Sequence, residues 1–321
     1  QGSQVDLRPV EDKLKAITWC CYNGEQQGTT AMNILFGKVN PSGRLPFTWY
    51  YDEAELPNII DYAVRTNDKV AQKTQVTKTE YLGRTYQYFK GKVRYPFGYG
   101  LSYTDFEYSD LHIDRKTVSP DDTIKISFNV TNIGDVDGYE VAQVYVKSPN
   151  AGTADRPFKQ LRGFDKKMIK SGETVRFEID LPVYKMYFFD NEQHMIFDQG
   201  EYIIEVGHDS EKASQNTAKF MLNGELTRRI AHVVASPSAH FIRDVDTVIS
   251  TNLSVAFNDE SFADLEKDVK ITFASANENI AVVDEKGNVT GKASGTTKII
   301  ATAEYKSAKS KTSFPVTVNF E

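Results

Sequence analysis

The chain has 321 residues, a formal net charge of −6 and a sequence pI near 5.5. An acidic balance offers no basic patch for nucleic acid, and no apolar run is long enough to span a membrane. A chain of this length is expected to form two or three domains. It begins with Gln1 rather than methionine, so we expect a mature or cut fragment.

The first apolar segment predicts one α/β unit. Residues 15–22 are apolar on both alternating faces, which indicates a central strand covered by helices. Residues 26–36 then carry apolar side chains at helical spacing, and Gly37 supplies a left-handed cap. Residues 45–50 indicate a short buried strand. One such unit is too little for a doubly wound domain, so partner strands are expected to precede Gln1 or to come from another chain.

Cysteine usage gives no disulfide framework. Cys20 and Cys21 are the only two cysteines, and they are adjacent in the apolar run. A buried thiol pair is expected rather than a vicinal disulfide.

Two turn-rich stretches, residues 40–46 and 95–103, are each bounded by apolar runs. Pro41 and Gly43 predict a tight turn in the first stretch, and the second alternates aromatic residues with glycines. The two stretches are either rigid corners between domains or the lining of a ligand site. Residues 52–80, between them, are mostly polar and predict a long irregular connection that is functional or mobile.

The first hundred residues resemble the end of the second domain of family 3 glycoside hydrolases. The resemblance covers residues 23–28 (Asn-Gly-Glu-Gln-Gln-Gly), 35–37 (Leu-Phe-Gly), 40–46, 83–89 (Gly-Arg-Thr-Tyr-Gln-Tyr-Phe) and 96–104. It implies exo-acting hydrolysis of β-linked sugars with retention at the anomeric carbon. In the family the nucleophilic Asp lies on a TIM-barrel domain, and the acid/base Glu lies upstream of the segment that begins here.

Alternating strands begin at Phe106. Period-two runs near residues 124–130, 141–146, 175–181 and 202–206 are separated by turn signals and predict an antiparallel β-sandwich. Motifs such as Arg156-Pro157 and Gly200-Glu201-Tyr202 resemble the fibronectin III-like domain that follows in many family 3 enzymes. The basic run 159–170 is read as a solvated strand edge.

The last segment resembles a bacterial immunoglobulin-like domain of group 2. The resemblance rests on residues 280–284 (Ile-Ala-Val-Val-Asp), 287–291 (Gly-Asn-Val-Thr-Gly) and 295–301. Lys286-Gly287-Asn288 predicts a hairpin turn, and Ile299 and Ala301 are expected to face the core. Such modules are typical of secreted and surface proteins, so the resemblance implies an extracellular or cell-envelope location in a bacterium.

The chemistry of retaining hydrolysis requires two carboxyl groups roughly 5 Å apart. The repeating strand–helix pattern of a barrel is absent from this sequence, so no catalytic residue is assigned here. The substrate-binding candidates are Glu25, Arg84 and Tyr86. At a helix start the dipole is expected to stabilise the Glu25 carboxylate, whereas a catalytic acid must hold its proton. Arg84 among tyrosines either hydrogen-bonds a sugar hydroxyl or fastens its loop to the sheet.

No metal or cofactor is expected, because the five histidines are scattered without ligand spacing and no nucleotide loop follows a strand. The fold class expected is α+β multidomain: a partial α/β sandwich domain (1–105), a fibronectin III-like sandwich (106–224) and an Ig-like sandwich (225–321). The function expected is the C-terminal portion of a retaining β-glycosidase, most simply a β-glucosidase. It would act on oligosaccharides together with a TIM-barrel portion of the same enzyme. The alternatives are a β-xylosidase, or a non-catalytic module that binds carbohydrate or the cell surface.

Overall fold

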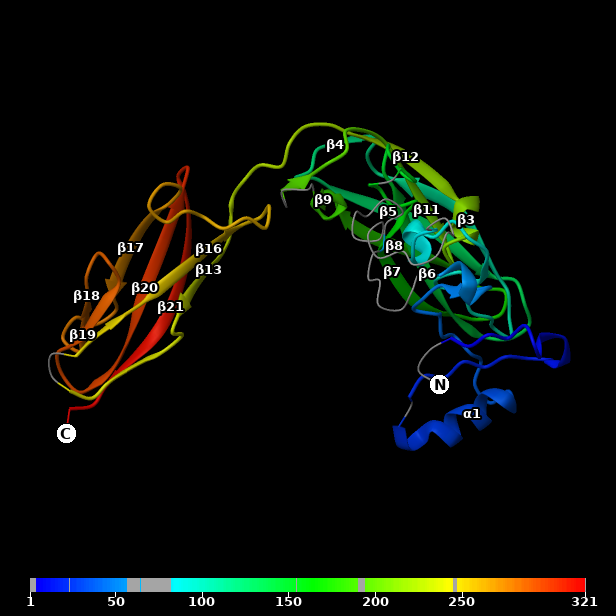
Figure 1. Ribbon diagram of the computed structural model, residues 1–321, viewed down its shortest axis with the longest axis horizontal. Helices are drawn as coiled ribbons and strands as arrows, with labels where there is room; N and C mark the ends of the chain where they lie inside the picture. The colour runs from blue at the N-terminus through cyan, green and yellow to red at the C-terminus, as the bar shows by residue number, and fades with distance from the viewer. Residues whose placement is uncertain are drawn as a thin grey trace. The chain divides into compact units, whose positions relative to one another are not determined.

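The computed structural model describes residues 4–22, 24–56, 64, 82–153, 155–189, 194–244 and 247–320. The chain divides into two compact units (Figure 1). The first consists of Gln1–Tyr187 with Phe197–Glu225, and the second of Phe188–Ile196 with Leu226–Glu321. No helix in the described part of the chain is both long and apolar enough to cross a membrane.

The opening part of the first unit contains short elements around one small strand pair. Strand β1 (Trp49–Tyr50) runs antiparallel to β2 (Val93–Tyr95). Trp49 is buried, its Nε1 donates to the carbonyl of Val5 at 3.1 Å, and its ring meets Tyr95 edge to face. The remaining elements are η1 (Glu11–Lys13), η2 (Gly24–Gln26), α1 (Gln27–Leu35), η3 (Glu53–Glu55) and α3 (Thr85–Tyr88).

The strand predicted for residues 15–22 does not form. None of the described strands pairs with this segment, and Ile17 and Tyr22 are 39% and 83% exposed. The apolar pattern of the sequence indicates only which residues tolerate burial. A strand also needs a neighbouring strand with which its backbone can form hydrogen bonds. The expected buried thiol pair is wrong for the same reason: Cys20 is half-buried and Cys21 exposed, and both are free thiols.

The predicted helix is confirmed as α1. Gly37 adopts a φ of +68°, the amide of Lys38 donates to the carbonyl of Asn33 at 2.8 Å, and the helix ends there as predicted. The apolar stripe of this helix is nevertheless uncovered by the described residues. Leu35 and, just after the helix, Phe36 are 60% and 74% exposed.

The tight turn predicted at residues 40–46 is absent. Gly43 has no positive φ, and residues 41–45 run without a turn beside residues 98–99. The amide of Leu45 donates to the carbonyl of Tyr99 at 2.9 Å, and that of Gly98 donates back to Leu45 at 2.8 Å. These non-local hydrogen bonds override the local turn preference. Of the strand predicted for residues 45–50, only Trp49–Tyr50 forms. The irregular connection predicted for residues 52–80 lies largely outside the described residues.

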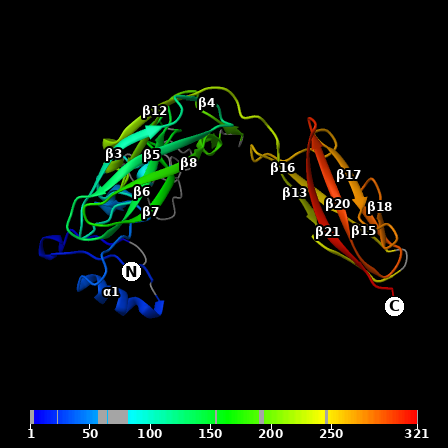
Figure 2. The same cartoon turned by 180° about the vertical axis from the view of Figure 1, so that it is seen from behind.

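The predicted antiparallel sandwich is confirmed in the rest of the first unit. One sheet has the order β4-β12-β11-β6-β7 and the other β3-β5-β8 (Figure 2). Ile126, Phe128, Val144 and Ile204 are among the buried residues that fill the core between them. The strands are β3 (Phe106–Ile113), β4 (Thr117–Val118), β5 (Thr123–Asn132), β6 (Gly138–Lys147), β7 (Gln160–Ile169), β8 (Thr174–Pro182), β11 (Gly200–Gly207) and β12 (Thr217–Leu222), with η4 (Val183–Met186) and η5 (Lys212–Gln215).

The basic run 159–170 is confirmed as a strand edge. It contains β7, the last strand of the five-stranded sheet, and Phe164 on it is 68% exposed. Charged side chains on an edge strand discourage pairing with another chain.

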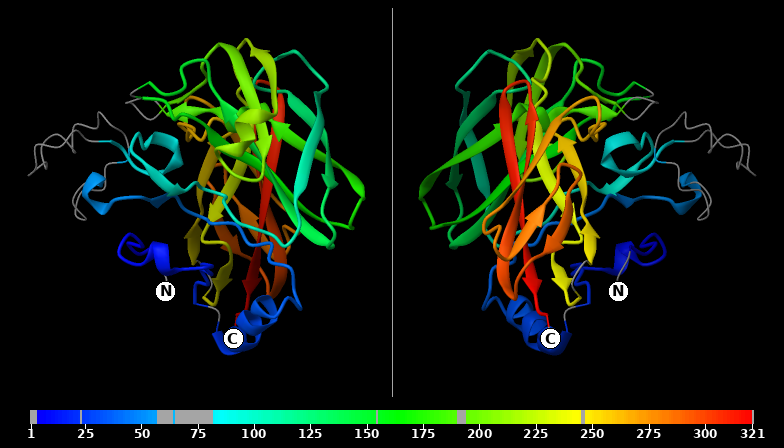
Figure 3. Two further views of the ribbon diagram at one scale, coloured as in Figure 1. Left: turned by 90° about the vertical axis from the view of Figure 1, so that its right-hand side faces the viewer. Right: turned by 90° about the vertical axis from the view of Figure 1, so that its left-hand side faces the viewer.

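The second unit is also built mainly of antiparallel strands, with a long hairpin of β20 and β21 (Figure 3), and β14 pairs with β21 in parallel. The sheets have the orders β14-β21-β20-β17, β15-β19-β18 and β13-β16, with a short β9–β10 pair. The turn at Gly287 (φ +82°) and the burial of Ile299 and Ala301 are as predicted. The strands are β9 (Phe188–Phe189), β10 (Met195–Ile196), β13 (Ile230–Ser236), β14 (His240–Ile242), β15 (Val248–Ser250), β16 (Asn252–Phe257), β17 (Lys270–Ser275), β18 (Ala281–Val283), β19 (Asn288–Gly291), β20 (Gly295–Tyr305) and β21 (Ala308–Val318).

Candidate functional site

Tyr86, one of the three substrate-binding candidates, packs against the sandwich. Its hydroxyl accepts a hydrogen bond from the amide of Leu161 at 2.9 Å. Its ring stacks on Phe97 at 4.5 Å and meets Tyr145 edge to face at 5.8 Å. Burial raises the pKa of Tyr86 above its ordinary value. These contacts fasten α3 to strands β6 and β7.

Arg84 lies directly before α3 and is half-buried. Gly83 beside it has a φ of +81°, and a Cβ there would lie 2.5 Å from the carbonyl oxygen of Tyr88. The amide of Thr85 donates to the hydroxyl of Tyr50 at 2.9 Å. The position of Arg84 is therefore set by a backbone turn that only glycine allows.

Glu25 lies in a different element. It is exposed in η2, directly before α1, and η2 packs beside that helix. The structure thus brings Arg84 and Tyr86 together at the start of α3 and places Glu25 in η2, directly before α1.

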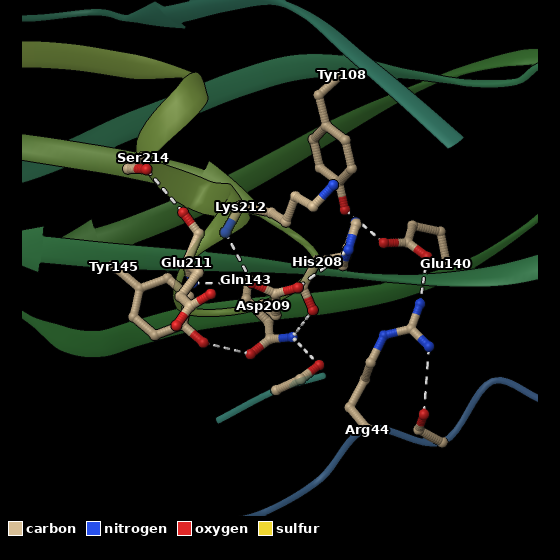
Figure 4. A network of polar contacts seen from close by, with 12 residues as sticks. Arg44, Tyr108, Glu140, Gln143, Tyr145, His208, Asp209, Glu211, Lys212 and Ser214 are labelled. Atoms are coloured by element: carbon tan, nitrogen blue, oxygen red, sulfur yellow. Dashed lines mark hydrogen bonds and ion pairs between the residues drawn. The ribbon is translucent and has the colours of Figure 1, made fainter. Parts of the chain in front are cut away.

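A buried polar cluster joins the opening part of the chain to the sandwich (Figure 4). Glu140, at the start of β6, is fully buried. Its Oε2 accepts from Nη2 of Arg44 at 2.6 Å, and its Oε1 accepts from the hydroxyl of Tyr108 at 2.6 Å. We refer to Arg44, Tyr108 and Glu140 as the Glu140 cluster. Each carboxylate oxygen has a donor, as a buried charge requires.

Gln143, three residues along β6, holds the second turn-rich stretch. Its Nε2 donates to the carbonyl of Gly98 at 3.2 Å, and its Oε1 accepts from the hydroxyl of Tyr145 at 2.7 Å. Gly98 has a φ of +82°, and a Cβ there would lie 2.2 Å from Oε1 of Gln143. No side chain fits between these groups.

Asn40 fixes the first turn-rich stretch in a similar way. Its Oδ1 accepts from the hydroxyl of Ser102 at 2.9 Å and the amide of Tyr103 at 2.8 Å. Its Nδ2 donates to the carbonyl of Asp137 at 3.1 Å. Together with Gly98, these contacts favour the interpretation of the two stretches as rigid corners rather than as the lining of a ligand site.

The electrostatics match this structural role. Burial, together with the neighbouring Glu140 carboxylate, raises the pKa of Tyr108 well above its ordinary value, so Tyr108 remains a donor. Burial alone would raise the pKa of Asp209, but hydrogen bonds from His208 and from the amides of Lys212 and Glu211 lower it. Asp209 therefore stays ionised and holds the turn that leads into η5. Among the described residues, no group of three or more His, Cys, Asp or Glu is arranged to hold a metal ion.

Sequence reasoning missed Glu140 and Gln143 as structural residues. Glu140 occupies the inward-facing position of β6, in step with Ala142 and Val144. A charge at an apolar position of a strand was the available signal. Gln143 has no such signal, because it lies on the opposite face of β6, where the carbonyls of Gly98 and His208 accept from its amide.

Three families match successive parts of the chain. Residues 1–103 match the glycosyl hydrolase family 3 C-terminal domain, residues 140–210 the fibronectin type III-like domain, and residues 250–313 the bacterial Ig-like domain of group 2.

Curated relatives include thermostable β-glucosidase B of Acetivibrio thermocellus, 35% identical over 212 residues, covering 65% of this chain and 27% of that protein. A xylan 1,4-β-xylosidase of Xylanibacter ruminicola is 34% identical over 210 residues, covering 65% of this chain and 22% of that protein. The structure of β-glucosidase 3B from Thermotoga neapolitana with α-D-glucose aligns with a TM-score of 0.56 at 30% identity, covering 68% of this chain and 30% of that one.

The chain thus spans about a quarter of the length of these two curated relatives. Residues 1–103 belong to the C-terminal domain of glycoside hydrolase family 3, and the chain continues through a fibronectin type III-like domain into a bacterial Ig-like domain of group 2.

Proposed function

We propose that this chain works as the C-terminal portion of a retaining, exo-acting β-glycosidase that removes terminal β-linked sugars from oligosaccharides. The match of residues 1–103 to the family 3 domain carries the proposal. A β-glucosidase is the first candidate, since that is the name of the relative that is 35% identical. A β-xylosidase is the alternative, because the xylosidase relative is 34% identical.

In this proposal the chain supplies scaffold and one wall of the sugar cleft, and a TIM-barrel portion supplies the nucleophile. Two features support the need for further polypeptide. Residues 15–22 have the pattern of a central strand but no described partner, and the apolar side of α1 is exposed. Arg84, Glu25 and Tyr86 remain the proposed sugar-binding residues of that wall, with Tyr86 acting through its anchoring of α3, which begins directly after Arg84.

The experiment compares aryl β-glucoside and aryl β-xyloside as substrates. The purified 321-residue chain should release no aryl alcohol above the buffer blank, whereas the longer protein containing the barrel should hydrolyse at least one substrate. Turnover by the chain alone would contradict the proposal that the chain supplies scaffold and a cleft wall but no nucleophile. The ratio of kcat/KM for the two substrates decides between glucosidase and xylosidase.

Arg84 is tested in the longer protein. Replacing a sugar-binding guanidinium, as in Arg84→Met, should raise KM more than it lowers kcat. Arg115→Met is the matched control, because Arg115 is half-exposed and pairs with Asp122 on the sandwich. An unchanged KM in Arg84→Met assigns Arg84 to loop structure only.

The location and domain boundaries are further parts of the proposal. An extracellular or envelope location is supported by the fibronectin-like and Ig-like domains, and fractionation of the producing bacterium tests it. We propose domains at 1–105, 106–224 and 225–321, which limited proteolysis at the two junctions tests.

A non-catalytic binding module is the second candidate. Phe241 and Phe262 in the second unit are 68% and 71% exposed, and exposed aromatic rings can stack on sugars. Phe257, another aromatic residue of this unit, is buried and cannot stack on a sugar. Retention of the chain on insoluble cellulose or xylan, lost in Phe241→Ser, would favour this function.

A further inference from the structure

A groove of about 340 Å³ lies on the sandwich of the first unit, away from residues 82–89. One wall comes from the edge strand β3, through Phe106 and Glu107, and from Ile133 after β5. The other wall comes from the end of β11 and from η5. It contributes Gly207, His208, Lys212, Gln215 and Asn216. The groove therefore follows the open edge where the two sheets meet.

The polar groups around this groove are of mixed character. Glu107 offers a carboxylate, Lys212 an ammonium group and Gln215 an amide with both donors and acceptors, and all three are exposed. The charges of Glu107 and Lys212 offset each other. The lining thus lacks the excess of one sign that an anion or a cation requires.

Three side chains of the groove lining are held in place by hydrogen bonds or ion pairs. The hydroxyl of Tyr108 donates to Glu140 at 2.6 Å (Figure 4). His208 is held by Oδ2 of Asp209 at 3.1 Å, and Asn216 donates to the carbonyl of Val206 at 3.3 Å. A preorganised lining reduces the side-chain entropy lost when a ligand binds.

We propose that this groove is an accessory binding site for a neutral saccharide of one or two rings. Hydroxyl groups of a sugar both donate and accept, which matches Glu107 as acceptor, Lys212 as donor and Gln215 as either. The apolar surfaces of Phe106 and Ile133 suit the C–H face of the ring. The volume lies at the small end of the range for ligand pockets, about 300–1,000 Å³. The choice of a sugar, rather than another polyol, rests on the proposed function.

The test is a titration of the ¹⁵N-labelled 321-residue chain with glucose, cellobiose and xylobiose, followed by amide chemical shifts. We expect saturable shifts confined to the groove, near Gly207, Lys212 and Asn216. Affinity should be in the millimolar range, since few polar contacts hold the ligand. Glu107→Gln and Lys212→Met should each weaken binding about tenfold, equivalent to ~1.4 kcal/mol.

Lys219→Met is the matched control, because Lys219 is exposed on β12 and pairs with Glu201 at 2.7 Å, outside the groove. This variant should bind as the wild type does. Absent or scattered chemical-shift changes in the wild-type chain would overturn the proposed site. So would chemical-shift changes in Lys212→Met that equal those of the wild type. Tighter binding of glucuronate than of glucose would overturn its neutral specificity. Loss of hydrolysis in the longer protein bears on the proposed function alone, because the titration needs no catalysis.

Discussion

Arg44 and Glu140 are 96 residues apart in the sequence, yet Nη2 of the first lies 2.6 Å from Oε2 of the second. Their side chains are 9% and 0% exposed. The pair connects the family 3 segment to the first residues of β6, so the two parts share a buried charge pair rather than only a covalent link. Such a pair is costly to break, because the remaining charge stays buried without a partner.

Replacing Arg44 should therefore lower the free energy of unfolding of the first unit. Arg44→Met leaves the Glu140 carboxylate with Tyr108 as its one remaining donor, and we expect a loss of about 3–5 kcal/mol in the free energy of unfolding. Urea unfolding followed by tryptophan fluorescence measures it, since Trp49 is buried in this unit.

The matched control is Lys219→Met. Lys219 is 59% exposed and pairs with Glu201, which is 52% exposed, at 2.7 Å. Loss of an exposed pair should cost less than about 1 kcal/mol. Equal losses in the two variants would show that the buried pair has no special role in stability.

The sandwich strands could be predicted because their pattern is local. Ile126 and Phe128 point inward every second residue whatever lies beyond the sheet, and the structure buries both. The strand predicted around Ile17 was wrong, because a strand needs a neighbouring strand to accept its backbone hydrogen bonds and no described residue supplies one. Gln143 could not be predicted for a related reason. Its side chain is covered by residues distant in the sequence, among them Gly98 and His208, and sequence alternation carries no information on what covers the outer face of a sheet.

Gly98 provides a second prediction. Gly98→Ala combines a left-handed backbone with a Cβ placed 2.2 Å from Oε1 of Gln143, whose amide is held by three hydrogen bonds. We expect a loss of more than about 3 kcal/mol in unfolding free energy, the size typical of severe single changes. Gly172→Ala is the control that separates the strain of a left-handed backbone from the steric clash of the added Cβ.

Gly172 has a φ of +74° and open space around its Cβ position. Its replacement should cost only the backbone strain, about 1–2 kcal/mol. If both alanine variants lose the same stability in urea unfolding, the close approach of Gly98 to Gln143 contributes nothing.

His240 makes the stability of the second unit depend on pH. It is 2% exposed on β14, lies 2.9 Å from Oγ1 of Thr251 and meets the ring of Phe314 edge to face. Burial lowers the pKa of His240 below its ordinary value of 6.5. The folded unit therefore keeps the ring neutral where the unfolded chain already binds a proton. Stability contributed in this way is unaffected above about pH 6.5 and falls as the pH drops below it.

Thermal unfolding between pH 8 and 5 measures this effect. His240→Gln should flatten the decline of Tm below pH 6.5, whatever its Tm at pH 8. His232→Gln is the control, because His232 is exposed on β13 and should leave the decline unchanged. A decline of the same steepness in His240→Gln would assign the pH dependence to other groups.

The exposed apolar side of α1 leads to the last prediction. Phe36 is 74% exposed directly after the helix, and a surface phenylalanine contributes little to the fold that exposes it. Phe36→Ser should change the unfolding free energy of the 321-residue chain by less than about 0.5 kcal/mol. It should also reduce self-association of the chain in sedimentation experiments, because an apolar patch is removed.

In the longer protein, by contrast, the same substitution should lower stability. If Phe36 is covered there by the remainder of the α/β domain, burial of its side chain contributes about 1.5–3 kcal/mol, and Phe36→Ser should lower the Tm of that protein. Phe164→Ser is the matched control, since Phe164 is 68% exposed on edge strand β7 and is expected to stay exposed. Equal Tm values for Phe36→Ser and Phe164→Ser would mean that further polypeptide leaves α1 uncovered, which contradicts the role proposed for residues 1–105.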